Sequence, residues 1–145
     1  MKDILLELAT AFLGSLGFAM LFNVRRQFWI PGSLGGMLGW GIYLFAAAQM
    51  EGVFMPCLIA SAFAAFYAEV LARVLKAPAT IFFIPSIVPL IPGSTLYYTM
   101  SYAVQRAWDI SSSYGFLTIQ YALSIASGIS LVWAFSMMIT KILKK

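Results

Sequence analysis

The chain has no histidine and a single cysteine among its 145 residues. Histidine is the commonest general base and the commonest metal-binding side chain, so its absence removes much of ordinary enzyme chemistry. The one cysteine, Cys57, lies in an apolar run and can build neither a disulfide framework nor a metal cluster. Clustered carboxylates and nucleophile–base pairs are also missing. The sequence therefore predicts a protein that is not an enzyme and that holds no metal and no cofactor.

Charged side chains are scarce as well. They make up 10% of the chain, whereas a soluble domain has about 25%. Hydrophobic residues make up 62%, which predicts one transmembrane domain over residues 1–145. The net charge of +4 could point to nucleic acid. The basic residues lie between the hydrophobic runs, however, so we expect the lipid bilayer and no nucleic acid as the partner.

Five apolar stretches predict an all-α polytopic protein with about five transmembrane helices. A spanning helix needs about 20 apolar residues. The link around Glu51 and Gly52 is very short, so the second and third helices should form an antiparallel hairpin. The predicted spans cover residues 4–22, 34–50, 53–72, 80–105 and 116–140.

The distribution of Lys and Arg predicts the orientation of these spans. With five crossings, the N-terminus shares one side of the membrane with the second and fourth loops, and the C-terminus shares the other side with the first and third loops. The first side carries two basic residues, Lys2 and Arg106. The second side carries seven: Arg25, Arg26, Arg73, Lys76, Lys141, Lys144 and Lys145. Because basic loops stay in the cytoplasm, we expect the N-terminus outside and the C-terminus inside.

The fourth stretch is interrupted by Pro85, Pro89 and Pro92, and then by Gly93. Each interior proline removes a helical hydrogen bond and crowds the preceding turn. Lipid cannot satisfy the carbonyl groups that this frees, so the broken backbone has to face protein or a water-lined cavity. We therefore expect a helix broken near the bilayer midplane, which is how many transporters build a substrate site. The freed carbonyl groups belong to Ile81, Pro85 and Val88.

Polar residues follow the break. Ser94 is a favourable N-cap residue, and amide groups at a helix N-terminus favour an anion such as a carboxylate. From Ser94 onward the polar residues are spaced to share one helical face, and a similar spacing recurs in the last stretch at Gln120, Ser124 and Ser127. The alternative is that these groups bond only within or between helices. The candidate substrate-binding residues are Pro92, Gly93, Ser94, Tyr97, Tyr98, Ser101 and Gln105.

Two carboxylates lie inside the predicted spans. Glu69 precedes Arg73 by four residues, the favourable spacing for a helical ion pair. This pair is either structural or, because ionisable groups in membranes are often functional, a gate or proton site. Glu7 lies one turn inside the first span, and we interpret it as a side chain that reaches back to the interface.

Small residues recur four apart in the first three stretches, and such patterns let membrane helices approach closely. The third stretch has Ala60, Ala64, Ala68 and Ala72. The second has two overlapping glycine pairs, at residues 32 and 36 and at residues 35 and 39. We interpret both patterns as helix packing; the alternative for the glycines is a permeation path.

Several short motifs together resemble the threonine/serine exporter family, in its short subunit type. They are Phe22-Asn23-Val24, the run from Tyr67 to Arg73 followed by Lys76-Ala77-Pro78, Pro85, the run from Pro89 to Ser94, and Tyr97. The similarity covers nearly the whole chain, and the part from Glu69 to Tyr97 is the specific one.

This resemblance implies a subunit that exports small hydroxy amino acids or related small carboxylates across the bacterial inner membrane, driven by an ion gradient. It also implies a larger membrane subunit of the same family, or further copies of the chain, as partner. It marks Glu69, Arg73, Pro89, Pro92, Gly93 and Ser94 as candidate functional positions. The competing interpretation is a scaffold or regulatory subunit that does not transport, in which protein would pack the break tightly and leave no cavity.

Overall fold

The computed structural model describes residues 2–143, with side chains from residue 3 to residue 138. Within that range the chain forms helices and short connections and no strand, which confirms the predicted all-α class. In chain order the helices are α1 (Lys2–Leu21), η1 (Arg26–Phe28), α2 (Trp29–Ala47), α3 (Phe54–Leu75), α4 (Ala79–Ile87), η2 (Val88–Leu90), α5 (Gly93–Val104) and α6 (Trp108–Leu143), where η marks a short 3₁₀ helix. By length and composition, α1, α2, α3 and α6 can each cross a membrane, and α4 with α5 forms a fifth candidate if the bent pair is one span.

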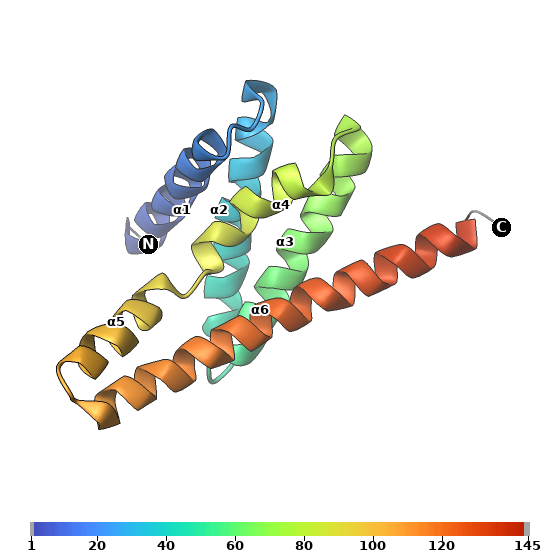
Figure 1. The fold of residues 1–145 in the computed structure, drawn as a ribbon. Coiled ribbons are helices and arrows are strands. Elements are labelled where there is room, and N and C mark those ends of the chain that lie inside the picture. Colours follow the sequence, from blue (N-terminus) through green and yellow to red (C-terminus); the bar gives the residue numbers. More distant parts are fainter. Residues whose placement is uncertain (1, 144–145) are drawn as a thin grey trace.

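The helices form a bundle with one projecting arm (Figure 1). α1, α2 and α3 lie side by side, and α4 packs against α2 and α3. α5 leads away from this bundle and packs chiefly against the first half of α6, which then crosses back to lie along α3 (Figure 1). The largest core cluster, around Ala60, Ala64, Ile87 and Leu90, therefore sits where α3 meets the end of α4 and η2.

Helices α3 and α6 run in the same direction. Their contacts follow the same order along both helices, from the first turn of α3 to its last third. These contacts are Ser124 Oγ donating to Phe54 O (2.6 Å), Gly128 against Ser61, and Ser136 Oγ donating to Glu69 Oε2 (3.1 Å).

The small residues serve close helix packing, as their spacing predicts. Gly32, Gly35, Gly36 and Gly39 of α2 are all buried, and so are Ala60, Ala64 and Ala68 of α3. A Cβ added to Gly35 would collide with Ser86 Oγ and would lie 2.7 Å from Tyr67 Cε1. Neighbouring side chains thus fill the glycine face of α2, which favours packing over a permeation path.

Two helices begin earlier than the stretches predicted from the sequence. α6 begins at Trp108 rather than near residue 116, so most of the predicted loop at 106–115 is helical. Hydroxyl groups make this possible: Ser112 and Ser113 bond the carbonyl of Asp109, and Ser111 Oγ donates to Thr99 O of α5 at 2.8 Å. α2 begins at Trp29 rather than near residue 34, because Pro31 falls in the first helical turn, where a missing N–H group costs little.

Candidate functional site at the broken helix

The helical structure is interrupted between Ile87 and Gly93. α4 ends at Ile87, one 3₁₀ turn follows, and α5 begins at Gly93 after the extended residue Ile91. The two helical pieces are bent by 52°. Pro92 is the N-cap of α5, and its carbonyl accepts the amide of Leu96 at 3.2 Å. The predicted N-cap role of Ser94 is therefore wrong, because the first intrahelical bond already closes on Pro92.

The carbonyl groups near the prolines have identifiable surroundings. Val88 O accepts the amide of Ile91 at 3.2 Å, within the 3₁₀ turn. The other two face the glycines of α2: Pro85 O lies 3.1 Å from the place of a Cβ on Gly36, and Ile81 O lies 3.9 Å from the same place on Gly32. The bare α2 backbone thus covers these carbonyl groups, which keeps them away from lipid.

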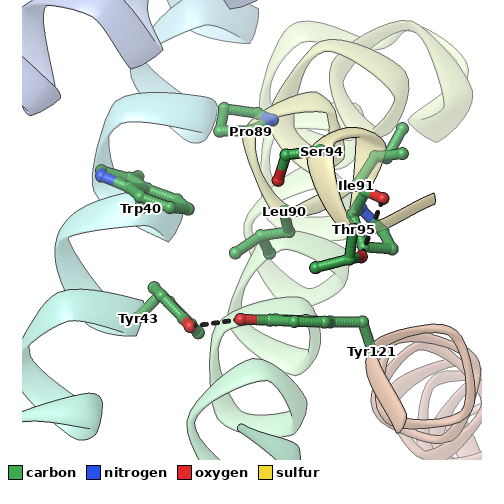
Figure 2. A pocket seen from close by; sticks show the side chains of 9 residues that line it. Trp40, Tyr43, Pro89, Leu90, Ile91, Ser94, Thr95 and Tyr121 are labelled. Atoms are coloured by element: carbon green, nitrogen blue, oxygen red, sulfur yellow. Dashed lines mark hydrogen bonds between the residues drawn. The ribbon is translucent and has the colours of Figure 1, made fainter. Parts of the chain in front are cut away.

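A pocket of about 140 Å³ lies beside the break, between α2 and α6 (Figure 2). Its volume is well below the roughly 300–1,000 Å³ of sites for drug-sized ligands, so it suits a small metabolite. α2 contributes two aromatic residues, α6 contributes one, and the break supplies the rest. The lining residues are Trp40, Tyr43, Pro89, Leu90, Ile91, Pro92, Ser94, Thr95 and Tyr121.

Aromatic side chains form one wall of this pocket. The hydroxyl groups of Tyr43 and Tyr121 are hydrogen-bonded at 2.9 Å, which joins α2 to α6 across the pocket (Figure 2). Trp40 stacks on Tyr43 with 5.0 Å between ring centroids and 27° between planes. Together the three side chains present two hydroxyl groups and an indole ring to a ligand in the pocket.

Polar groups of α5 form the opposite wall. The Ser94 side chain lines the pocket and points towards α2 (Figure 2). Thr95 Oγ1 donates to Pro92 O at 3.2 Å and accepts from Thr118 Oγ1 at 3.0 Å, which holds it in place. The amide of Gly93 donates to Ile91 O at 2.8 Å. The next two amides, of Ser94 and Thr95, are first-turn groups for which the helix has no acceptor.

The structure divides the residues that sequence reasoning grouped along one helical face. Pro89, Pro92 and Ser94 meet at the pocket. Gly93 lies between two lining residues, and a Cβ built on it meets no atom within 4 Å.

The later turns of α5 lie elsewhere. Tyr97, Ser101 and Gln105 line a separate open hollow of about 310 Å³, where Gln105 Nε2 donates to Ser101 Oγ at 3.2 Å. Tyr98 packs in an aromatic cluster, with ring centroids 6.2 Å from Tyr102 and 5.3 Å from Tyr114.

The second polar face is also divided. Ser124 is fully buried and donates to Phe54 O at 2.6 Å, so its hydroxyl group joins two helices. The pocket residue from this helix is Tyr121, which the polar spacing does not include.

Sequence reasoning missed Trp40, Tyr43, Thr95 and Tyr121. A usable signal did exist for Trp40: tryptophan in membrane helices favours the interface, yet Trp40 lies in the middle of an apolar stretch. An aromatic residue at that depth suggests a specific partner. Nothing in the local sequence, however, relates Tyr43 to Tyr121, because they meet only where α2 and α6 both pack against α3.

Glu7, for which the sequence suggested a side chain that reaches back to the interface, has a partner on α2. Trp40 Nε1 donates to Glu7 Oε2 at 3.2 Å. With Thr10, Ala11, Trp40 and Pro89, Glu7 lines a second cavity of about 250 Å³, which is wide open to the surface. This cavity shares Trp40 and Pro89 with the pocket at the break.

Glu69 and Arg73 form an ion pair at 3.0 Å, and their side chains are 22% and 58% exposed. Ser136 of α6 takes part, since its Oγ accepts from Arg73 at 2.9 Å and donates to Glu69 at 3.1 Å. None of the three residues lines either cavity. The geometry therefore favours a structural role for the pair, in which α6 is tied to the end of α3.

We expect Glu69→Gln to leave the export that the family resemblance implies nearly intact. The partly exposed pair is worth about 0–1 kcal/mol, and glutamine keeps an oxygen that can accept from Ser136. Thermal unfolding in detergent should show a small loss of stability, and efflux should remain close to wild type. Loss of gradient-driven efflux by a well-folded Glu69→Gln protein would instead assign proton coupling to Glu69.

A polytopic helical membrane protein with a broken helix, and at the break a small pocket of aromatic, apolar and hydroxyl groups, has the architecture of a membrane transporter. The family model described as "Threonine/Serine exporter, ThrE" matches residues 7–135. The chain belongs to this family and is a threonine/serine exporter-type membrane protein. No curated protein and no solved structure gives a significant match.

Proposed function

We propose that the chain is a subunit of an ion-gradient-driven exporter of threonine, serine or related small carboxylates, and that the pocket at the break is its substrate site. The observation that carries this proposal is the pairing of a helix N-terminus with an aromatic wall around about 140 Å³ of space. A scaffold subunit would not require that cavity. The family supports a small-molecule substrate.

The chemistry of each wall suits one part of a hydroxy amino acid. First-turn amides and the dipole of α5 favour the substrate carboxylate. The hydroxyl groups of Ser94 and of the Tyr43–Tyr121 pair are suited to bond the substrate hydroxyl. The faces of Trp40 and the two tyrosines favour its ammonium group. Each group thus meets a complementary surface within one small pocket.

We also propose five crossings, with α4 and α5 forming one broken span. α3 and α6 run in the same direction, as the third and fifth of five alternating spans must. With a re-entrant α4–α5 loop, α6 would be a fourth span and would oppose α3. Five crossings and the distribution of basic residues support a bacterial inner-membrane protein with its N-terminus outside and its C-terminus in the cytoplasm. A C-terminal reporter that is active only in the cytoplasm tests this, and an inactive, stably inserted fusion would refute it.

We propose that the working unit contains a larger subunit of the family or further copies of the chain. No residue of α5 is buried, and Leu96, Met100 and Val104 are 50%, 64% and 85% exposed. This helix therefore has free surface for another membrane helix. Mass measurement after purification in mild detergent tests the proposal, which fails if a monomer transports alone.

Metabolite efflux tests the function itself. Cells that make this chain together with the larger partner subunit should lose intracellular threonine or serine faster than cells that lack this chain. Equal loss, at confirmed membrane levels of the protein, would leave the scaffold role as the better account.

A further inference from the structure

We propose that Glu7 is the proton-binding carboxylate that couples export to the proton gradient, and that Trp40 connects it to the substrate pocket. This inference rests on the proposed function and adds a coupling residue to it. The motivation is the position of Glu7: among the five acidic residues of the chain, it is the one that lines either of the two cavities at the break.

A direct chain of contacts links this carboxylate to the substrate pocket. Trp40 Nε1 donates to Glu7 Oε2 at 3.2 Å, and the Trp40 ring stacks on Tyr43 at 5.0 Å. Tyr43 in turn shares a hydrogen bond of 2.9 Å with Tyr121. Trp40 therefore contacts the Glu7 carboxylate through its indole nitrogen and also lines the substrate pocket. Movement of the indole would change both the hydrogen bond to Glu7 and the shape of the pocket.

The helices that pack chiefly against α1 supply no cation that would hold Glu7 in an ion pair. They are α2, α4 and η2, and none of them carries a charged residue. Tyr43 is the one titratable group that they contain. On α1 the other charged residues are Lys2 and Asp3, and the exposed Asp3 lies one turn earlier. An intramembrane carboxylate in such a place is a functional candidate by default.

The protonation state changes what Glu7 can do for Trp40. The ionised carboxylate accepts a strong, charge-assisted bond from the indole N–H group, and the neutral acid accepts a weaker one. Proton binding therefore frees Trp40 to move at the edge of the substrate pocket. With the N-terminus outside, Glu7 lies towards the outer face, from which the proton enters. The proton leaves to the cytoplasm as the substrate moves out, so the two fluxes are exchanged.

Transport assays separate proton coupling from substrate binding. We would compare wild type, Glu7→Gln and Glu7→Asp in vesicles that also contain the partner subunits. Two rates are needed: threonine efflux driven by an imposed proton gradient, and threonine–threonine exchange without a gradient. We expect Glu7→Gln to lose gradient-driven efflux and to keep exchange, because exchange needs no net proton movement. Glu7→Asp should restore gradient-driven efflux in part.

Other outcomes of these assays overturn the proposal. Normal gradient-driven efflux by Glu7→Gln would show that this carboxylate does not carry the proton. Loss of both efflux and exchange in a well-inserted protein would make Glu7 a ligand of the substrate. If wild type transports neither way, the proposed function itself fails.

Fluorescence tests the link without transport. The pH-dependent part of tryptophan emission in the purified chain should be reduced by Trp40→Phe, which keeps a stacking ring but removes the N–H donor, and by Glu7→Gln. Glu69→Gln serves as the matched control, since Glu69 contacts neither cavity, and it should leave that emission unchanged. A pH response identical in wild type and Glu7→Gln would refute the connection.

Discussion

Ser94→Leu is expected to abolish export while the protein remains folded and inserted. Ser94 lines the pocket, and its side chain points towards the aromatic wall (Figure 2). A leucine there would occupy much of a space of only about 140 Å³. Because Ser94 itself is exposed, the larger side chain needs no rearrangement of the core. Efflux should fall by at least about tenfold, which corresponds to about 1.4 kcal/mol of lost substrate binding.

Ser101→Leu provides the matched control for this substitution. It makes the same chemical change on the same helix, two turns further along, where Ser101 lines the open hollow and not the pocket at the break. Efflux by this variant should stay near wild type. If Ser94→Leu exports normally at normal membrane levels, the substrate path lies elsewhere, in the open hollow beside α5 or in a partner.

Gly36→Leu is expected to prevent folding of the helix bundle. A Cβ at this position would collide with Ser15 Oγ, and it would lie 2.9 Å from Ser15 Cβ and 3.1 Å from Pro85 O. Both α1 and α4 would have to move away from α2, and Pro85 O would lose its cover. Overpacking typically costs about 1–3 kcal/mol and occasionally more. At Gly36 the first added atom already collides with a side chain and crowds a backbone carbonyl, so we expect a cost above that range, comparable to the roughly 5–15 kcal/mol that holds a domain together.

Gly17→Leu provides the comparison for that prediction. Gly17 lies on the exposed face of α1, where an added Cβ meets no atom within 4 Å. The amount of monodisperse protein after detergent extraction should collapse for Gly36→Leu and remain normal for Gly17→Leu. Equal yields of the two variants would show that the approach of α1 to α2 at Gly36 is not required.

The helices and the break were predictable because their causes are local. Apolar length sets the helices, and glycine and alanine spacing sets the faces that pack. The prolines place the interruption of the fourth stretch within a few residues. The N-cap was harder to predict, because a helix can start at either Pro92 or Ser94. In the structure the first intrahelical hydrogen bond runs from the amide of Leu96 to the carbonyl of Pro92.

The pocket was only partly predictable, because it is a tertiary feature. Ser94 and the prolines belong to the break and were recognised with it. The aromatic wall combines α2 with α6, and Tyr43 and Tyr121 are 78 residues apart in the chain. Such a pair leaves no periodic signal in either helix. Glu7 is the clearest example, since its hydrogen-bond partner is an indole 33 residues away.

The early start of α6 has a similar origin. Residues 108–115 look like a loop by polarity, yet α5 folds back along them. Ser111 bonds to Thr99, and Tyr114 stacks on Tyr102 with 12° between their planes. These contacts with α5 stabilise the first turns of α6, although the polarity of residues 108–115 alone would predict a loop.

Substrate protection of a cysteine at position 94 tests the central claim most directly. The native Cys57 is fully buried, so the wild-type chain provides the blank for labelling by a membrane-permeant maleimide. Labelling of Ser94→Cys should slow in the presence of threonine or serine, because the substrate occupies the pocket that this side chain lines. Labelling of Ser101→Cys should not change. If threonine leaves the labelling of Ser94→Cys unaltered in a protein that still exports it, the pocket at the broken helix is not the substrate site.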